Sequence, residues 1–218
     1  YTLLGSKDAR SIEDLRGKII GVTGAGAYSD FAIRIFLKRH HIDPDRDVTL
    51  RAIGGTAVRA IALERGVISA APFTAEDTIR LLDKGYPMIV NLNEALRIPQ
   101  SILVTRGEML QKYPETSKRF LKAMILGMQV AKHNKKEAIQ IGVASGLPGE
   151  ADLINRSYDL FSPGYAADLS VAHDGIQIML DEDIRAGVVD KKFTLDRVVN
   201  EKILKQAQQE LKSEGRLK

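Results

Sequence analysis

A short glycine turn, placed between an apolar run and a segment of helical spacing, constrains this chain more than any other feature. Within residues 18–32 a run rich in β-branched side chains ends at Thr23, and Gly24 and Gly26 follow it. This order predicts a strand, a tight turn and the start of a helix. The N–H groups of a first helical turn have no partner inside the helix and lie at the positive end of its dipole. The turn is therefore a candidate site for an anionic group.

The first part of the chain alternates apolar runs with segments of helical spacing. Strands are predicted at residues 18–23, 47–53, 67–71 and 87–92, and helices at residues 29–40, 56–65 and 75–84. Helices between successive apolar strands are typical of βαβ units, so we expect an α/β fold with a mostly parallel sheet. On the helix at residues 56–65, the side chains expected to face inward are Val58, Ile61 and Ala62.

After one more strand, predicted at residues 100–105, the chain is expected to be almost entirely helical. Helices are predicted at residues 114–134, 136–145, 149–161, 168–182 and 200–213. The apolar face of the long helix at residues 114–134 is formed by Phe120, Leu121, Met124, Ile125 and Met128. The last helix is expected to bury Ile203, Leu204, Ala207 and Leu211.

Composition and charge exclude several classes of function. The chain has 218 residues, no cysteine and a formal net charge of +4. Without cysteine there is no disulfide framework, cysteine nucleophile or thiolate metal site. The basic residues are scattered and aromatic residues make up only 6% of the chain, so no nucleic-acid partner is expected. No apolar run reaches the length of about 18 residues that a membrane span needs.

Nucleotide-binding turns have requirements that residues 24–29 do not meet. Ser29 stands where the dinucleotide fingerprint has its third glycine, and no acidic residue ends the second predicted strand. No Gly-Lys-Ser/Thr follows the turn, which excludes a P-loop. Two interpretations stay open: a connection that binds nothing, and a site for a small anionic or polar ligand. In the second, Thr23, Tyr28 and Ser29 add side-chain groups to the backbone donors.

Two further turns are expected at the same edge of the sheet, and no catalytic assembly is visible near any of them. Residues 54–56 and 72–74 also follow predicted strands, so Thr56 and Phe73 are candidate ligand contacts, although Thr56 also suits a helix cap and Phe73 also suits the core. The four histidines are dispersed or adjacent on one helix end, and no nucleophile elbow or metal-binding motif is present. We therefore expect no enzymatic activity, no cofactor and no metal.

Several short motifs together resemble one family of transport proteins. Residues 11–22 read SIEDLRGKIIGV, and residues 42–48 read IDPDRDV. An Ile-Gly-Gly sequence at residues 53–55, a Val-Ile-Ser-Ala-Ala run at residues 67–71 and Tyr-Pro-Glu at residues 113–115 complete the pattern. The combination resembles the periplasmic substrate-binding proteins of ABC transporters, of the type that binds nitrate, sulfonate, taurine or thiamine-pyrimidine precursors.

The resemblance implies two α/β lobes that close on a ligand. Residues 6–99 would form the second lobe, while residues 1–5 and 100–218 would supply hinge strands and the C-terminal helices of a first lobe that this chain mostly lacks. The incomplete lobe is expected to expose apolar surface, which favours a homodimer or a missing N-terminal fragment. The implied location is periplasmic or at the cell surface, although the chain carries no signal peptide.

The resemblance also implies a function and a set of ligand contacts. The function is solute binding for an ABC importer, with a sulfonate, carboxylate or pyrimidine-like ligand and a membrane permease as partners. Two alternatives stay open: an enzyme on the same fold, such as a pyrimidine-precursor synthase or a small hydrolase, and an effector-sensing module of a regulator. The contacts carried over are Thr23, Gly24, Ala25, Gly26, Tyr28 and Ser29, with Thr56 and Phe73 less directly placed.

Overall fold

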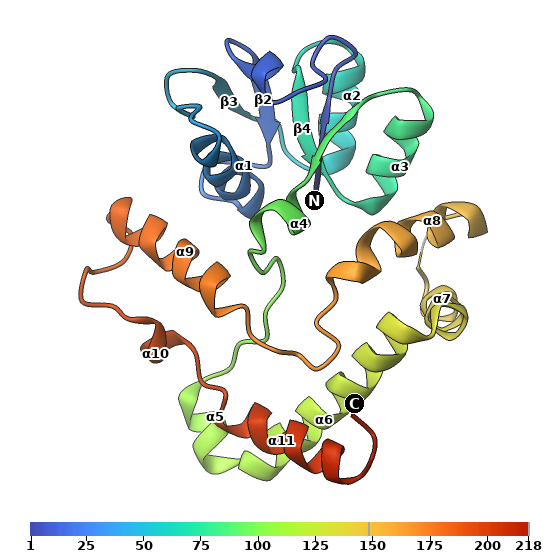
Figure 1. Cartoon of the computed structure of the whole chain (residues 1–218), viewed down its shortest axis with the longest axis vertical. Helices are drawn as coiled ribbons and strands as arrows, with labels where there is room; N and C mark the ends of the chain where they lie inside the picture. Colours follow the sequence, from blue (N-terminus) through green and yellow to red (C-terminus); the bar gives the residue numbers. More distant parts are fainter. Residues whose placement is uncertain (148, 218) are drawn as a thin grey trace. The chain divides into compact units, whose positions relative to one another are not determined.

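The computed structural model describes residues 1–147 and 149–217, which form two compact units (Figure 1). Unit 1 comprises Tyr1–Arg97 and Gly149–Leu160, and unit 2 comprises Ile98–Pro148 and Phe161–Lys218. Each unit has a hydrophobic core of its own. The assignment of residues 6–99 to one lobe, and of residues 1–5 and 100–218 to hinge strands and another lobe, stays a prediction.

Unit 1 is built on a five-stranded sheet with the strand order β3-β2-β4-β1-β5. Strand β2 (Ile19–Val22) pairs in parallel with β3 (Thr49–Ala52) and with β4 (Ala70–Phe73). Strand β1 (Thr2–Gly5) runs antiparallel to β4 and to β5 (Met88–Asn91). All strands except β1 therefore run in one direction, which confirms the predicted α/β fold with a mostly parallel sheet.

A helix follows each of the three neighbouring parallel strands. Helix α1 (Tyr28–Arg39) follows β2, α2 (Thr56–Glu64) follows β3 and α3 (Ala75–Asp83) follows β4 (Figure 1). Helices α2 and α3 begin at the predicted residues, and α1 begins one residue earlier than predicted. The other helical segments of unit 1 are η1 (Glu13–Leu15), α4 (Leu92–Leu96) and α8 (Ala151–Phe161) without its last residue.

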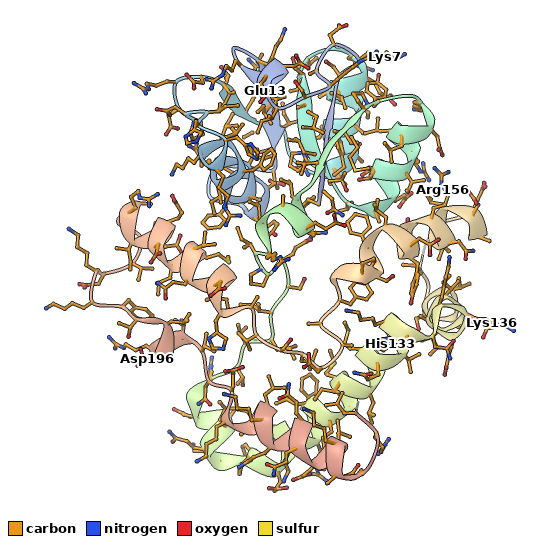
Figure 2. The ribbon with its side chains drawn as sticks, in the orientation of Figure 1. Lys7, Glu13, His133, Lys136, Arg156 and Asp196 are labelled. Atoms are coloured by element: carbon orange, nitrogen blue, oxygen red, sulfur yellow. The ribbon has the colours of Figure 1, made fainter. Side chains whose placement is uncertain are left out.

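Helix α8 is joined to α3 by an ion pair, although more than sixty residues separate them in the chain. Arg156 of α8, labelled in Figure 2, donates from Nη1 and Nη2 to the two carboxylate oxygens of Asp83, at 2.9 and 2.6 Å. A two-point guanidinium–carboxylate pair fixes geometry as well as distance. Both residues belong to unit 1, so the pair joins residues 149–160 to the rest of that unit.

The core of unit 1 joins the central strands to α2 and α3. Leu4 of β1, Leu63 of α2, Phe73 of β4 and Leu81 of α3 are at most 2% exposed and belong to one apolar cluster. Because β4 lies between β2 and β1, its side chains are covered by strands on either side and by these helices. Phe73 is the largest apolar member of the fully buried set.

The buried face of α2 differs from the predicted one. Val58 and Ile61, both expected to face inward, are 52% and 50% exposed, whereas Ala62 is buried as predicted. Arg59 is fully buried instead, together with Ala62 and Leu63, which follow it at i+3 and i+4 on the same helix face. The prediction is wrong for Val58 and Ile61 because Arg59 hydrogen-bonds to carbonyl groups at the ends of the neighbouring strands.

Strand β4 begins at Ala70, three residues later than the strand predicted at residues 67–71. The N–H groups of Val67 and Ile68 donate to the carbonyl of Ala62. These two residues therefore close the end of α2 instead of joining the sheet, and Val67 is half exposed.

Unit 2 is helical, and its core lies between α6 (Pro114–His133) and α11 (Lys202–Ser213). Ile125 of α6 packs with the inner face of α11, and Lys122 adds ion pairs to Glu210 and Glu214 at 3.2 and 2.5 Å. The predicted inner face of the last helix is confirmed, since Ile203, Leu204, Ala207 and Leu211 are all buried. The other helical segments are α5 (Gly107–Lys112), α7 (Lys135–Ala144), η2 (Ser162–Gly164), α9 (His173–Arg185) and α10 (Leu195–Val198).

Three predictions for unit 2 are wrong. Residues 100–105 form no strand, and helix α9 begins at His173 rather than at residue 168. Of the predicted apolar face of α6, only Ile125 is buried, and Phe120 is 54% exposed. Apolar spacing predicts which residues share a face, but burial requires a neighbour that covers it. Within the described part of unit 2, α11 covers the side of α6 around Ile125.

Unit 2 exposes the apolar surface that the sequence leads us to expect. The exposed large apolar side chains of this unit include Ile102, Leu103, Val104, Tyr113, Phe120, Ile141, Val143, Leu147, Val188 and Val198. In the part of the chain that the structure describes, no helix combines the length and the apolar character needed to cross a membrane.

Candidate ligand-binding site

Three helices begin beyond the carboxyl ends of three adjacent strands in unit 1. The N-cap residues of α1, α2 and α3 are Ala27, Gly55 and Thr74, and none of them makes a side-chain capping bond. Because β3, β2 and β4 are parallel neighbours, these three helix starts share one edge of the sheet (Figure 1). Each start contributes about half a positive charge, so this edge attracts anions.

The side chain of Arg59 ties the ends of these three strands together. Its Nη1 donates to Thr23 Oγ1 at 2.6 Å and to the carbonyl of Gly54 at 2.8 Å, and its Nη2 donates to the carbonyl of Pro72 at 2.8 Å. Thr23 comes directly after β2, Gly54 comes after β3, and Pro72 lies in β4. One side chain of α2 thus holds all three strand ends at fixed distances.

Arg59 also places a buried positive charge at this edge. Its side chain is fully buried, and among the described residues no carboxylate forms an ion pair with it and its Nε has no hydrogen-bond partner. Burial lowers the pKa of the Arg59 guanidinium, yet an arginine keeps its charge at neutral pH. A buried charge is costly unless it is compensated, so an anion at this edge would stabilise it.

Thr23 and Ser29 form a closed pair of hydrogen bonds at the start of the turn. The N–H of Thr23 donates to Ser29 Oγ at 2.9 Å, and Ser29 Oγ donates to Thr23 Oγ1 at 3.0 Å. Ser29 is only 1% exposed, whereas Thr23 is exposed. Ser29 therefore braces the turn from inside, and Thr23 is the exposed residue of the pair.

The glycine turn is closed by a carboxylate of its own chain. Asp30 is 4% exposed and accepts a 2.9 Å hydrogen bond from the N–H of Gly26. Its second oxygen accepts from Arg34 Nε at 3.0 Å, and Arg34 also pairs with Asp45 at 2.6 Å. Gly26 has φ = +74°, a conformation that favours glycine. The sequence predicts that a ligand anion binds at this turn. At the Gly26 N–H the structure instead has the carboxylate of Asp30, so this N–H is already paired within the chain.

Two aromatic rings stand beside Arg59. The rings of Tyr1 and Tyr28 are stacked with centroids 5.7 Å apart and an interplanar angle of 26°. The guanidinium carbon of Arg59 lies 5.9 Å from the centroid of the Tyr1 ring, within the range of a cation–π contact. Burial raises the pKa of the Tyr28 phenol to about 12, so Tyr28 is neutral throughout the physiological range.

The raised pKa of Tyr28 predicts a late component in the titration of the six tyrosines. In the folded chain one phenol should ionise near pH 12, and Tyr28→Phe should remove that component from an absorbance titration. The neutral phenol is favoured by the fold, so the stability it contributes is present below pH 10 and declines as the pH rises from about 10 to about 12. A Tyr28→Phe variant with an unchanged late component would contradict this assignment.

The structure brings most of the predicted ligand-contact residues to one edge of the sheet, but two of them, Ser29 and Phe73, are buried. Thr23, Ala25 and Gly26 are exposed; Gly24, Tyr28 and Thr56 are partly buried. Ser29 is buried, and Phe73 is fully buried within the core cluster, so its ring has no exposed surface. Whether each of these residues contacts a ligand stays a prediction.

Arg59 is the residue of this edge that sequence reasoning missed. An arginine within a helical segment is usually solvent-exposed. The available signal is its spacing, because Ala62 and Leu63 follow it at i+3 and i+4 and therefore share its helix face. That spacing competes with an equally regular apolar face through Val58 and Ile61.

Comparison with known proteins places the chain in a family. A family model described as NMT1/THI5 like matches residues 1–138, which is more than half of the sequence. The chain belongs to the NMT1/THI5-like family. Among proteins of curated function, no sequence matches it significantly.

Solved structures show which fold this family member shares. The periplasmic sulfonate-binding protein SsuA from Methylobacillus flagellatus KT has a TM-score of 0.75 and 19% identity, with 100% of this chain and 68% of that chain covered. The periplasmic nitrate-binding protein NrtA from Synechocystis PCC 6803 has a TM-score of 0.72 and 16% identity, with 96% and 64% covered. The desulfurization enzyme DszB has a TM-score of 0.62 and 14% identity, with 96% and 76% covered. The fold is thus that of periplasmic binding proteins, and one enzyme shares it.

Among the described residues, no group of three or more His, Cys, Asp or Glu side chains is arranged to hold a metal ion.

Proposed function

We propose that this NMT1/THI5-like chain is the solute-binding component of an ABC importer. It captures a small anionic or polar organic ligand, such as a sulfonate, a carboxylate or a pyrimidine-like molecule, and delivers it to a membrane permease. The observation that carries the proposal is the buried guanidinium of Arg59, which has no ion-pair partner among the described residues and lies where three uncapped helices begin.

The electrostatics of this edge favour an anion over a cation. Three helix starts and one buried guanidinium all contribute positive potential at the carboxyl ends of β2, β3 and β4. Asp30 is the nearest buried carboxylate of the turn, but it is compensated by Arg34 at 3.0 Å. Asp77, in the first turn of α3, is the acidic group of this edge that acts on Arg59, but it forms no ion pair with the guanidinium among the described residues, so a ligand with negative oxygen atoms is favoured.

The fold comparisons support the proposal. SsuA and NrtA, whose fold this chain shares, are described as periplasmic binding proteins for sulfonate and nitrate. We extend from them to this chain both the ligand class, small oxyanions, and an extracytoplasmic location. The ligand contacts proposed are Thr23, Gly24, Ala25, Tyr28 and Thr56, and we propose that Ser29, Gly26 and Phe73 act from within, by bracing Thr23, shaping the turn and supporting the strand ends.

Binding without catalysis is proposed even though the fold also occurs in DszB. The chain has no cysteine, and none of its histidines belongs to the turns at this edge. His40 and His41 follow the C-terminal end of α1, the end opposite to the glycine turn. His133, labelled in Figure 2, ends α6 in unit 2, and His173 begins α9. No nucleophile and base therefore meet beside Thr23 within the described residues.

The exposed apolar surface of unit 2 is a candidate binding surface for a protein partner. We propose that a second copy of this chain or an additional N-terminal segment covers residues such as Phe120, Ile141 and Val143, which are each more than half exposed. Light scattering of the purified chain is expected to show a dimer or a larger species. A monodisperse monomer would count against this part of the proposal.

Ligand binding can be measured directly. Isothermal titration of the chain with methanesulfonate, nitrate, acetate and a neutral pyrimidine is expected to show binding of at least one anion, weakened by added salt. Binding of none of these probes would contradict the proposed ligand class.

Ser29→Ala is expected to weaken binding, because it removes the brace of Thr23. The loss should be on the order of 1 kcal/mol for a neutral ligand and up to about 3 kcal/mol for a charged one. Ser101→Ala, at an exposed serine of unit 2, is the matched control and should leave the affinity unchanged. Equal affinities of Ser29→Ala and the wild-type chain would remove Ser29 from the site.

A further inference from the structure

We infer that the hydroxyl of Thr23 is restricted to donating, that it therefore selects ligands presenting an acceptor oxygen, and that Arg59 is the positioning residue that imposes this restriction. The identity of the ligand in this inference depends on the proposed function. The hydrogen-bond geometry does not, because it follows from the contacts among Thr23, Ser29 and Arg59.

The hydrogen bond between the hydroxyl groups of Ser29 and Thr23 has one direction. A hydroxyl group has one hydrogen to donate and two lone pairs that accept. Ser29 Oγ is buried and already accepts the N–H of Thr23 at 2.9 Å. A buried hydroxyl hydrogen that finds no acceptor is costly, and Thr23 Oγ1 lies 3.0 Å away as its acceptor. Ser29 therefore donates, and Thr23 accepts.

Arg59 occupies the remaining lone pair of the Thr23 hydroxyl. Arg59 Nη1 donates to Thr23 Oγ1 at 2.6 Å, and a guanidinium has no capacity to accept. Thr23 Oγ1 thus receives two hydrogen bonds, and both of its lone pairs are occupied. Its own hydrogen is the only hydrogen-bonding capacity left, and Thr23 is exposed. An incoming ligand can meet this hydroxyl only with an acceptor.

Arg59 is held in place and cannot release Thr23. Its guanidinium is fully buried and also donates to the carbonyls of Gly54 and Pro72, both at 2.8 Å. A planar guanidinium held at three points cannot rotate without breaking these bonds. Its charge also polarises the Thr23 hydroxyl and strengthens the bond that this hydroxyl donates. The preferred ligand group is a sulfonate, carboxylate or nitrate oxygen, and an N–H or O–H donor at this position is disfavoured.

Two probes of similar shape test the selectivity; because methanesulfonate is an anion and methanesulfonamide is neutral and keeps two acceptor oxygens, the test rests on how each affinity responds to Thr23→Val and not on the wild-type preference alone. Methanesulfonate presents three acceptor oxygens, whereas methanesulfonamide replaces one of them with an NH₂ donor. The wild-type chain should prefer methanesulfonate, and Thr23→Val should weaken methanesulfonate about 10- to 100-fold in Kd while changing methanesulfonamide much less. Thr23→Ser keeps the hydroxyl and should stay within about 3-fold of the wild-type affinity for methanesulfonate.

The other outcomes of the titrations are also decisive. An equal loss for both probes in Thr23→Val, with an unchanged far-UV spectrum, would show that Thr23 shapes the turn without selecting acceptors, and would overturn the inference. An unchanged methanesulfonate affinity in Thr23→Val would overturn it as well.

A ligand-free cycle separates this inference from the proposed function. Urea unfolding of the wild-type chain, Thr23→Val, Arg59→Met and the double variant measures whether the two side chains are coupled. Thr23→Val should shift the midpoint much less in the Arg59→Met background, because the bond it removes is already absent. Additive shifts would overturn the role of Arg59. If the cycle shows coupling but the wild-type chain binds neither probe, the proposed function fails while the donor geometry of Thr23 is upheld.

Discussion

Phe73→Ala is expected to lower the free energy of unfolding of unit 1 by about 3–5 kcal/mol. The ring of Phe73 is fully buried in the core cluster that joins β1, β4, α2 and α3. Its removal takes away apolar burial and leaves a cavity between Leu4, Leu63 and Leu81, which a closely packed interior fills only in part. The strand ends that form the candidate site depend on this packing, so ligand binding should be lost together with the fold.

Urea unfolding monitored by far-UV circular dichroism measures this effect. Ile61→Ala is the matched control, because Ile61 is also an apolar residue of unit 1 but is half exposed, and its cost should be below about 0.5 kcal/mol. Phe73→Leu separates packing from ligand contact, since leucine keeps most of the apolar volume. A folded Phe73→Leu variant that binds no ligand would show that the ring itself takes part in binding, contrary to its buried position.

Leu211→Ala is expected to lower the free energy of unfolding of unit 2 by about 2–5 kcal/mol. Leu211 has no exposed surface and lies in the cluster formed by α6 and α11. Ile125 is the residue of α6 that is buried in this cluster, so the contact between the two helices depends on few side chains. The ion pairs of Lys122 with Glu210 and Glu214 are partly solvent-exposed, and they are expected to compensate only weakly.

Unit 2 can be followed by limited proteolysis alongside urea unfolding, because a destabilised helix pair is cleaved sooner. Val188→Ala, at a residue that is 74% exposed, is the control and should leave both measurements unchanged. Ile125→Ala combined with Leu211→Ala should cost less than the sum of the single changes, since the two side chains share one cluster. A Leu211→Ala chain as stable as the wild type would contradict the assignment of this core.

Much of unit 1 was predictable because its signals are local. The apolar run before Thr23 and the glycines after it predict a strand and a turn, and the structure has β2 and α1 on either side of them. The same holds for the starts of α2 and α3 at Thr56 and Ala75. The terminal helix was predictable for a similar reason, since its apolar residues have one regular spacing and no competing face.

Other parts were not predictable because they depend on residues distant in the sequence. Helix α2 has two regular faces, and hydrogen bonds from Arg59 to Gly54 and Pro72 decide which one is buried. Residues 100–105 have an apolar composition suited to a strand, but a strand also needs a neighbour that pairs its backbone. Asp30 closes the turn that the sequence left open for an external anion.

The sequence by itself determined the alternation of strands and helices from β2 to α3, the glycine turn after Thr23 and the absence of cysteine chemistry, because these follow from neighbouring residues and composition. Only the tertiary structure decided what the turn offers to a ligand. It directed Asp30 to the Gly26 amide, Ser29 and Arg59 to the Thr23 hydroxyl, and Phe73 to the core. The physical reason is that each buried donor and charge must find a partner, and the available partners come from strands that become adjacent only on folding.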